Sequence, residues 1–328
     1  MKLIVLVLVM ATIISCTTEV NQDEKPNFQN EKTETLINKE DISEALEKQL
    51  INNNANYGAV LLIDIKTGNE ILSIEFVKAD SNCYQTCDTI INKVITPASL
   101  WKPITMALLL ESNCVTLNDS IDTKQGSISY NGIEMRDVFD LGTININQAM
   151  AKSSNIFFAE AVNKCYSSDM SKYYNDFNSL IKVVNKEFVD RLDFSIDSLH
   201  TMLWSSIGYY HSIKPKELLS LYSIIANNGL DVNNKRILKS ETAQAVHEAL
   251  SEVVQNGTGQ ELKPLDCAVA GKTGLTDMSN GNFINTFAGY FPADNPKYVC
   301  FFMMQIPANN LVYGNKWTFE MMEILTKQ

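Results

Sequence analysis

Apolar residues at strand spacing mark both ends of the chain, whereas apolar residues at helical spacing fill its middle. Five short apolar runs predict strands: residues 58–65, 70–76, 268–276, 286–291 and 297–306. The first two are separated by a short turn and are typical of a hairpin. Because strands at both ends enclose helices, we expect an α/β fold of the α+β sandwich type. It has one mainly antiparallel sheet built from both chain ends, with an inserted all-helical region.

Helical spacing predicts the remaining elements. A first helix begins at Asp41, which forms a capping-box-like pair with Glu44, and buries one apolar face. From about residue 96 to residue 250 the pattern is largely helical, and one helix carries Pro103 in its first turn, where proline is tolerated. Further helices are predicted at residues 146–152, 156–162, 218–228 and 316–325.

The N-terminal segment has the features of an export signal. One basic residue precedes about a dozen apolar residues, which is too short a run for a membrane span. The end of the run, at Cys16, resembles a bacterial lipobox, and plain secretion is the alternative. We therefore expect a lipoprotein signal peptide at residues 1–15, a lipidated and disordered linker at 16–40, and one folded domain at 41–328. The protein would lie in the cell envelope, anchored through lipid, with its domain outside the cytoplasm and on the periplasmic side.

The net charge, the histidines and the cysteines indicate which partners, metals and disulfides to expect. The net charge of −11 argues against nucleic acid and against anionic membrane surfaces. The three histidines lack ligand spacing to a cysteine pair, so we expect no metal and no cofactor. Export permits disulfides, and Cys83 and Cys87 are close enough in sequence to close a small loop. The pattern leaves the state of Cys267 and Cys300 open.

Three short strings carry the candidate chemistry. In chain order they are S-L-W-K at 99–102, S-S-N at 153–155 and K-T-G at 272–274. Ser179 and Lys182 repeat the first spacing, but no S-x-N follows them before the K-T-G. Only the set that begins at Ser99 completes the series S-x-x-K, S-x-N, K-T-G. Taken singly, the strings indicate an ordinary helix cap, a helix junction and a strand-end turn; their order favours an active site.

The first string suits a nucleophile and its base. Ser99 at a helix start and Lys102 three residues later lie on one face of the first turn, about 5 to 6 Å apart at Cβ, so the two side chains can hydrogen-bond. Burial and a neighbouring cation, for which Lys272 is the candidate, would lower the pKa of Lys102 until it can act as a base. The Ser99 backbone N–H is a candidate oxyanion donor.

Longer stretches around these strings resemble one known family. They are TPASLWKPIT at 96–105, AMAKSSNIFFAEA at 149–161, SIIANNG at 223–229, AGKTGLT at 270–276 and NTFAGYFPADNPKYVC at 285–300. Together they resemble the transpeptidase domain of class B penicillin-binding proteins over roughly residues 55–325. The resemblance implies acyl transfer on peptidoglycan stem peptides that end in D-Ala-D-Ala. β-Lactams would acylate the same serine, and cell-wall synthesis proteins are further partners.

The resemblance also implies residue roles. Ser99 is the nucleophile, Lys102 its base, Ser153 a proton relay to the leaving amine, and Asn155 a contact of the substrate amide and of Lys102. Lys272 and Thr273 of the K-T-G, which Gly274 completes, would bind the substrate carboxylate, with the backbone N–H of Leu275 as the second oxyanion donor. The roles concern these residues: Ser99, Lys102, Ser153, Asn155, Lys272, Thr273, Gly274 and Leu275.

One departure from the family pattern concerns Leu275. The family commonly has Thr or Ser directly after K-T-G, and strand alternation points the next residue, Thr276, to the other face. A hydroxyl near the substrate carboxylate is therefore lost, at about 0.5 to 3 kcal/mol of binding. A D,D-transpeptidase is the favoured activity; a D,D-carboxypeptidase, a serine β-lactamase and a non-catalytic penicillin-sensing lipoprotein are the alternatives.

Overall fold

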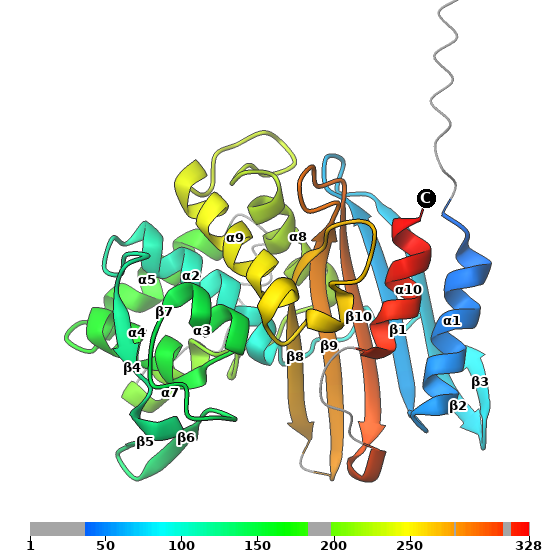
Figure 1. Cartoon of the computed structure of the whole chain (residues 1–328), viewed down its shortest axis with the longest axis horizontal. Coiled ribbons are helices and arrows are strands. Elements are labelled where there is room, and N and C mark those ends of the chain that lie inside the picture. Colours follow the sequence, from blue (N-terminus) through cyan, green and yellow to red (C-terminus); the bar gives the residue numbers. More distant parts are fainter. Residues whose placement is uncertain (1–36, 183–197, 279, 311–315, 328) are drawn as a thin grey trace, which may run out of the picture. The chain divides into compact units, whose positions relative to one another are not determined.

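A six-stranded sheet is the largest sheet of the described residues. The computed structural model describes residues 37–182, 198–278, 280–310 and 316–327. The sheet order is β3(Cys83–Thr86), β2(Glu70–Asp80), β1(Tyr57–Asp64), β10(Tyr298–Pro307), β9(Asn282–Phe291) and β8(Ala270–Met278). All neighbouring strands are antiparallel, and β1 pairs directly with β10. The predicted sheet from both chain ends is confirmed (Figure 1).

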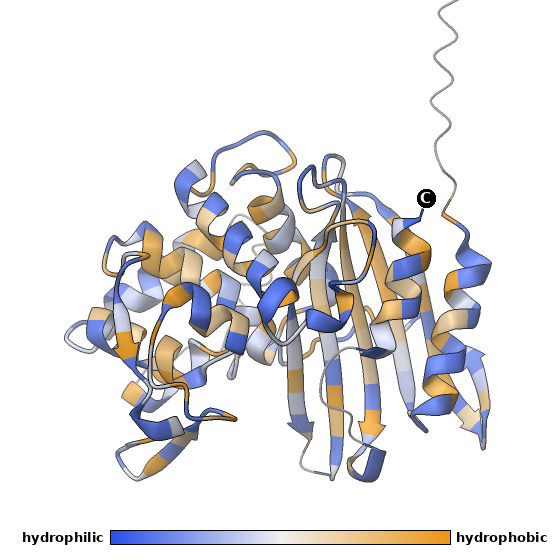
Figure 2. Ribbon diagram, viewed as in Figure 1, coloured by the Kyte–Doolittle hydropathy of each residue, from blue (hydrophilic) through white to orange (hydrophobic). Residues whose placement is uncertain are grey.

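The central strands are apolar on both faces because each face meets its own core. Along β1, Ala59 and Leu61 belong to the core shared with the helical region, whereas Val60 and Leu62 belong to a second core on the other face. Successive side chains of a strand point to opposite faces, so alternate residues of one apolar run serve the two cores. Figure 2 shows these strands as mostly hydrophobic along their length.

Helices cover the sheet and fill the inserted region. Their bounds are α1(Lys39–Asn52), α2(Lys102–Glu111), α3(Ile146–Lys152), α4(Asn155–Tyr166), α5(Met170–Ile181), α7(Leu199–Ser205), α8(Pro215–Ala226), α9(Ser240–Asn256) and α10(Lys316–Thr326). Short 3-10 turns are η1(Ala98–Trp101), η2(Lys124–Gly126), η3(Gln260–Leu262) and η4(Ala308–Asn310). Helices α1 and α10 lie side by side over the second core, and α8 packs on the opposite face of the sheet (Figure 1).

Three predictions about this architecture need correction. The inserted region is not all helical, since it contains two small two-stranded antiparallel sheets: β4(Ser120–Asp122) with β7(Thr143–Asn145), and β5(Ser127–Tyr130) with β6(Ile133–Arg136). Helix α1 begins earlier than Asp41, because the side chain of Asn38 accepts a hydrogen bond from Glu40 N and caps it there. Helix α8 begins at Pro215, three residues before the predicted start.

The cysteines pair differently from the sequence-based suggestion. Cys114 and Cys165 form a disulfide, whereas Cys83 and Cys87 are free thiols, so the suggested small loop is not closed. Cys267 and Cys300 are also free, and Cys300 is buried in the second core as a small apolar residue. The bridge joins the loop after α2 to the last turn of α4.

The predicted signal peptide at 1–15, the lipidation site Cys16 and the linker up to residue 36 lie outside the described residues. Within the described ranges, every helix is too short or too polar to cross a bilayer.

Candidate active site

The turn that carries Ser99 is shaped by close backbone contacts. Ser99 is half-buried in η1, and the preceding Ala98 has a positive φ of 46°. Ala98 N donates to Gly208 O at 3.3 Å, and a Cβ on Gly208 would lie 2.0 Å from Ala98 O. Only glycine fits there, and its φ of 89° also favours glycine. Tyr222 Oη donates to Leu100 O at 2.8 Å from α8, so this turn is held from two sides.

The second string forms the junction of two helices. Ser153 ends α3 in the left-handed conformation, with φ 58°. Ser154 caps α4, because its hydroxyl accepts a hydrogen bond from Phe157 N at 3.0 Å. Asn155 is the first residue of α4. The helix-junction interpretation is therefore correct as local structure, and the same junction turns Ser153 and Asn155 toward Lys102.

The third string lies on edge strand β8. Because side chains alternate along a strand, Lys272, Gly274 and Thr276 share one face. Gly274 lets the strand approach η1, since a Cβ there would lie 3.0 Å from Leu100 Cγ. Thr276 Oγ1 donates to Thr96 O at 3.4 Å, so its hydroxyl is bound to the backbone just before η1.

Both lysines converge on Ser153. Lys102 Nζ donates to Ser153 O at 2.5 Å, to Ser153 Oγ at 3.1 Å and to Asn155 Oδ1 at 2.7 Å. Lys272 Nζ lies 2.9 Å from the same Ser153 Oγ and 3.1 Å from Thr273 O. The structure thus brings side chains from all three strings into one hydrogen-bonded cluster, although they are far apart in sequence.

Ser99 stands beside this cluster without joining it. Leu100, the next residue in the chain, packs against β8, and Lys102 contacts the α3–α4 junction. Among the described residues, Lys102 Nζ makes its hydrogen bonds to Ser153 and Asn155, and none of these bonds joins it to Ser99 Oγ. Catalytic hydrogen bonds are often long before a substrate binds and tighten in the complex.

Burial sets the electrostatics of the cluster. Removal from water lowers the pKa of Lys102 to about 7, and the carboxylate of Asp137 opposes that effect. The pKa of Lys272 is lowered well below its usual value, first by burial and then by the charge of Lys102. Of the two expected causes, burial therefore accounts for the lowered pKa of Lys102, whereas Lys272 is not among its causes.

Two further polar residues, Asp137 and Thr258, lie at this site without belonging to any of the three strings. Asp137 follows β6 and binds the start of α4 through its carboxylate. Thr258 follows α9; its hydroxyl lies 2.6 Å from Thr273 Oγ1, and its backbone N donates to Ala151 O at 3.0 Å. The tertiary fold brings both residues to the site, and no spacing in the three strings signals them.

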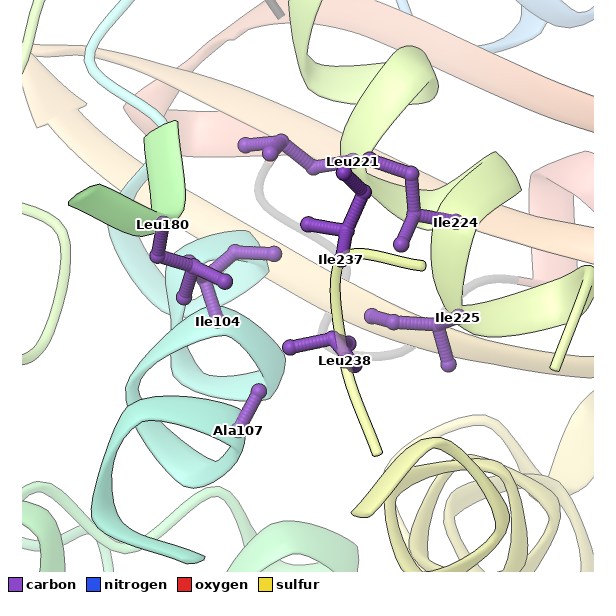
Figure 3. A pocket seen from close by; sticks show the side chains of 8 residues that line it. All are labelled: Ile104, Ala107, Leu180, Leu221, Ile224, Ile225, Ile237 and Leu238. Carbon is purple, nitrogen blue, oxygen red and sulfur yellow. The ribbon is translucent and has the colours of Figure 1, made fainter. Parts of the chain in front are cut away.

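A small apolar pocket lies elsewhere in the described part of the chain. Side chains from α2, α5, α8 and the loop before α9 line a small pocket that contains only aliphatic residues (Figure 3). Such a lining offers no group for acid–base or nucleophilic chemistry. In the part of the chain that the structure describes, no three His, Cys, Asp or Glu side chains are grouped to hold a metal ion.

Comparisons with known proteins give the same family as the three strings. Residues 58–322 match the family model described as the penicillin-binding protein transpeptidase domain. A probable peptidoglycan D,D-transpeptidase PenA from Neisseria flavescens is 26% identical over 301 residues, which cover 82% of this chain and 74% of that protein. Peptidoglycan D,D-transpeptidase FtsI from Escherichia coli (strain K12) is 25% identical over 298 residues, covering 80% of this chain and 49% of that protein.

Solved structures share the fold. The apo transpeptidase domain of Burkholderia pseudomallei penicillin-binding protein 3 superposes with a TM-score of 0.73 at 20% identity, covering 88% of this chain and 92% of that one. A structure described as a peptidoglycan glycosyltransferase from Burkholderia ambifaria gives a TM-score of 0.71, also at 20% identity, covering 88% of this chain and 93% of that one. The family match extends over most of the chain and includes all three strings. The chain therefore belongs to the penicillin-binding protein transpeptidase family.

Proposed function

We propose that this protein is a peptidoglycan D,D-transpeptidase that acts through an acyl-Ser99 intermediate on stem peptides ending in D-Ala-D-Ala. The observation that carries the proposal is the hydrogen-bonded cluster in which Lys102 and Lys272 share Ser153 Oγ. The activities that name the Neisseria and E. coli relatives support the same reaction.

The first step is attack by Ser99. Its Oγ adds to the carbonyl carbon of the penultimate D-Ala while its proton passes to the neutral amine of Lys102. A base is most useful when its pKa lies near the working pH, and burial brings the pKa of Lys102 to about 7. The backbone N–H groups of Ser99 and Leu275 are the proposed donors to the developing oxyanion.

The next step expels the terminal D-Ala. The C–N bond breaks, and the leaving nitrogen takes a proton from Ser153 Oγ, which recovers one from Lys102. The two contacts of Lys102 Nζ and Lys272 Nζ with Ser153 Oγ, at 3.1 and 2.9 Å, support such a relay. The acyl group then passes from Ser99 to the amine of a second stem peptide, whose proton returns along the same route.

Asn155 and the K-T-G residues 272–274 are the proposed substrate-binding residues. Asn155 would hold the substrate amide, and Lys272 and Thr273 would bind the terminal carboxylate. Gly274 supports this placement by letting β8 approach the Ser99 turn. Leu275 contributes its backbone N–H but no hydroxyl, which predicts weaker carboxylate and β-lactam binding than a Thr at this position would give.

Water as the acceptor would make the enzyme a D,D-carboxypeptidase. Fast hydrolysis of the acyl-enzyme would make it a β-lactamase, and a serine that does not acylate would make it a penicillin-sensing protein. Membership of the family favours transpeptidase activity over these alternatives. The access of solvent to acyl-Ser99 decides whether an amine or water accepts the acyl group.

A labelled-penicillin assay tests the proposal. Wild-type protein should form a covalent adduct that releases slowly, and Ser99→Ala should form none. Ser179→Ala is the matched control, because Ser179 has the same spacing to a lysine but lies exposed on α5, where its hydroxyl donates to Asn175 O. Fast release would indicate a β-lactamase. Absent labelling of the wild type, or retained labelling of Ser99→Ala, would refute the assignment.

We also propose that Cys16 is lipidated after removal of residues 1–15, which anchors the domain on the outer side of a membrane in the cell envelope. The lipobox-like sequence before Cys16 supports this. Several acyl chains bind a membrane far more firmly than one. The Cys16→Ala variant should accumulate as unmodified precursor, whereas Cys83→Ala should be processed normally. Normal membrane-anchored protein from Cys16→Ala would disprove lipidation at this residue.

A further inference from the structure

Asp137 binds the start of the helix that carries Asn155. One carboxylate oxygen accepts from Asn155 N at 2.5 Å and from Ile156 N at 3.1 Å, and the other accepts from Ser154 Oγ at 2.5 Å. The Ser154 hydroxyl in turn accepts from Phe157 N. A helix leaves its first N–H groups without partners inside the helix. Asp137 and Ser154 together satisfy the first three N–H groups of α4, with a negative charge at the positive end of the helix dipole.

The residue before Asp137 orients the Asn155 side chain. Arg136 O accepts from Asn155 Nδ2 at 2.9 Å. A carbonyl can only accept, so this contact fixes which end of the amide is the donor. The other end, Oδ1, is thereby aimed at Lys102 Nζ at 2.7 Å. Two consecutive residues at the end of β6 thus hold Asn155 through its main chain and its side chain.

From this arrangement we infer that Asp137 is a positioning residue for the acyl-transfer site. It anchors the α3–α4 junction so that Asn155 faces Lys102, and it places a fixed negative charge near that amine. Asp137 need not touch substrate for this role. The inference rests on the proposed function insofar as acylation is its readout.

The negative charge of Asp137 should have a measurable effect on the pKa of Lys102. The charged groups that face the amine are Asp137, from the loop after β6, and Lys272, from β8; the α3–α4 junction contributes the uncharged Ser153 and Asn155. Burial lowers the pKa of Lys102, and the carboxylate of Asp137 raises it. Removal of that charge should therefore lower the pKa of Lys102 further, so that the amine becomes neutral at lower pH.

Two variants separate charge from anchoring. Asp137→Asn keeps an acceptor for the backbone N–H groups but removes the charge, and Asp137→Ala removes both. We expect Asp137→Asn to move the acid limb of the acylation pH profile to lower pH. Asp137→Ala should reduce the acylation rate about 10- to 100-fold at every pH, because a displaced side chain costs this much.

Asp169→Ala is the matched control. Asp169 caps α5 by accepting from Lys172 N at 3.1 Å, and α5 carries none of the site residues. Its replacement should weaken a helix cap without changing the rate or the pH profile. If Asp137→Ala acylates as fast as Asp169→Ala, or if the acid limb of Asp137→Asn stays in place, the inference is overturned.

A second measurement does not depend on acylation. NMR of ¹³C-labelled lysine in the free protein, assigned with Lys102→Arg, reports the pKa of Lys102 directly. This pKa should fall in Asp137→Asn and stay unchanged in the Asp169 variant; an unchanged value in Asp137→Asn would refute the inference. Failure of wild-type protein to bind labelled penicillin would instead refute the proposed function alone.

Discussion

At the scale of single residues, the site depends on a lysine that is buried so completely that it can lose its proton. Lys102 has no exposed surface, yet its amine has three polar contacts that hold it in one orientation. Burial disfavours the ammonium form, and the contacts with Ser153 and Asn155 keep the nitrogen aimed into the site. The low pKa and the fixed position therefore have the same cause, namely the packing of α2 against the α3–α4 junction.

The acylation rate should follow the ionisation of Lys102. Only the neutral amine accepts a proton, and its pKa is about 7. The rate should therefore rise as the pH increases through about 7 and fall about tenfold for each pH unit below it. Labelled-penicillin acylation between pH 5 and pH 8 measures this profile. A flat profile across that range would contradict the role of Lys102.

Replacement of Lys102 should remove the base. Lys102→Ala should lower the acylation rate by about 10²-fold or more. Lys102→Arg should be similarly slow, since a guanidinium stays protonated at any pH of the assay. Lys182→Ala is the control, because Lys182 completes the other S-x-x-K spacing and lies at the end of α5. Near-normal acylation by Lys102→Ala would exclude the residue as the base.

Leu275 should limit the affinity of the site for carboxylates. Leu275→Thr restores the hydroxyl that the family commonly has, and one added hydrogen bond to a charged group contributes about 1.5 to 3 kcal/mol. We expect faster acylation by penicillin in Leu275→Thr, measured as the second-order rate constant. Leu275→Val controls for the change in side-chain shape. Equal rates in both variants would show that the hydroxyl has no role.

The order of the three strings was enough to identify the residues that meet in the site, but not the residues that hold them. Lys102, Ser153, Asn155 and Lys272 come together as the strings predict. Asp137 could not be found in this way, because it reaches Asn155 from the loop after β6 and belongs to no string. Its contact depends on how β6 packs against α4, which local spacing does not encode.

At the scale of elements, close backbone approach shapes the nucleophile turn. In Gly208→Ala the new Cβ would overlap Ala98 O and force the Ser99 turn to move. We expect acylation to fall at least about tenfold, and the folded state to lose stability. Thermal unfolding and penicillin labelling measure the two effects.

Gly142→Ala is the matched control for Gly208→Ala. Gly142 also has a positive φ, of 64°, but a Cβ there would meet nothing within 4 Å. Its replacement should cost only the backbone strain of about 1 to 2 kcal/mol and leave acylation intact. If both variants acylate normally, the contact between Gly208 and Ala98 does not shape the site.

Helices and strands could be predicted where the apolar residues repeat over enough positions to show a helical or strand spacing. The helix at 146–152 and the closing helix near 316–325 match α3 and α10 closely because apolar residues repeat over full turns. Strands β4 and β7 have three residues each, which is too few to show alternation. They form because they pair with each other, and that tertiary pairing is not visible in the local pattern.

At the scale of the whole molecule, the disulfide joins two helices that carry site residues. Helix α2 begins with Lys102 and α4 with Asn155, and Cys114 and Cys165 link the regions where these helices end. The bridge spans 51 residues, and a loop of this length stabilises a fold by about 4 kcal/mol.

Removal of the bridge should therefore lower stability. In the Cys114→Ala/Cys165→Ala double variant we expect the free energy of unfolding in urea to fall by about 4 kcal/mol. The control is Cys267→Ala, which removes a free thiol. An unchanged free energy of unfolding under oxidising conditions would show that the bridge does not constrain the unfolded chain.

The pairing of β1 with β10 has a consequence for biosynthesis. The chain is made from its N-terminus, so Ser99 and Lys102 emerge long before Lys272 and before the strand that must lie beside β1. A ribosomal product that stops between Lys102 and β8 carries the nucleophile without its second lysine and without strands β8, β9 and β10 of its sheet. We therefore expect such fragments not to be acylated, so that reactivity should arise only in chains that have been synthesised almost to the last helix.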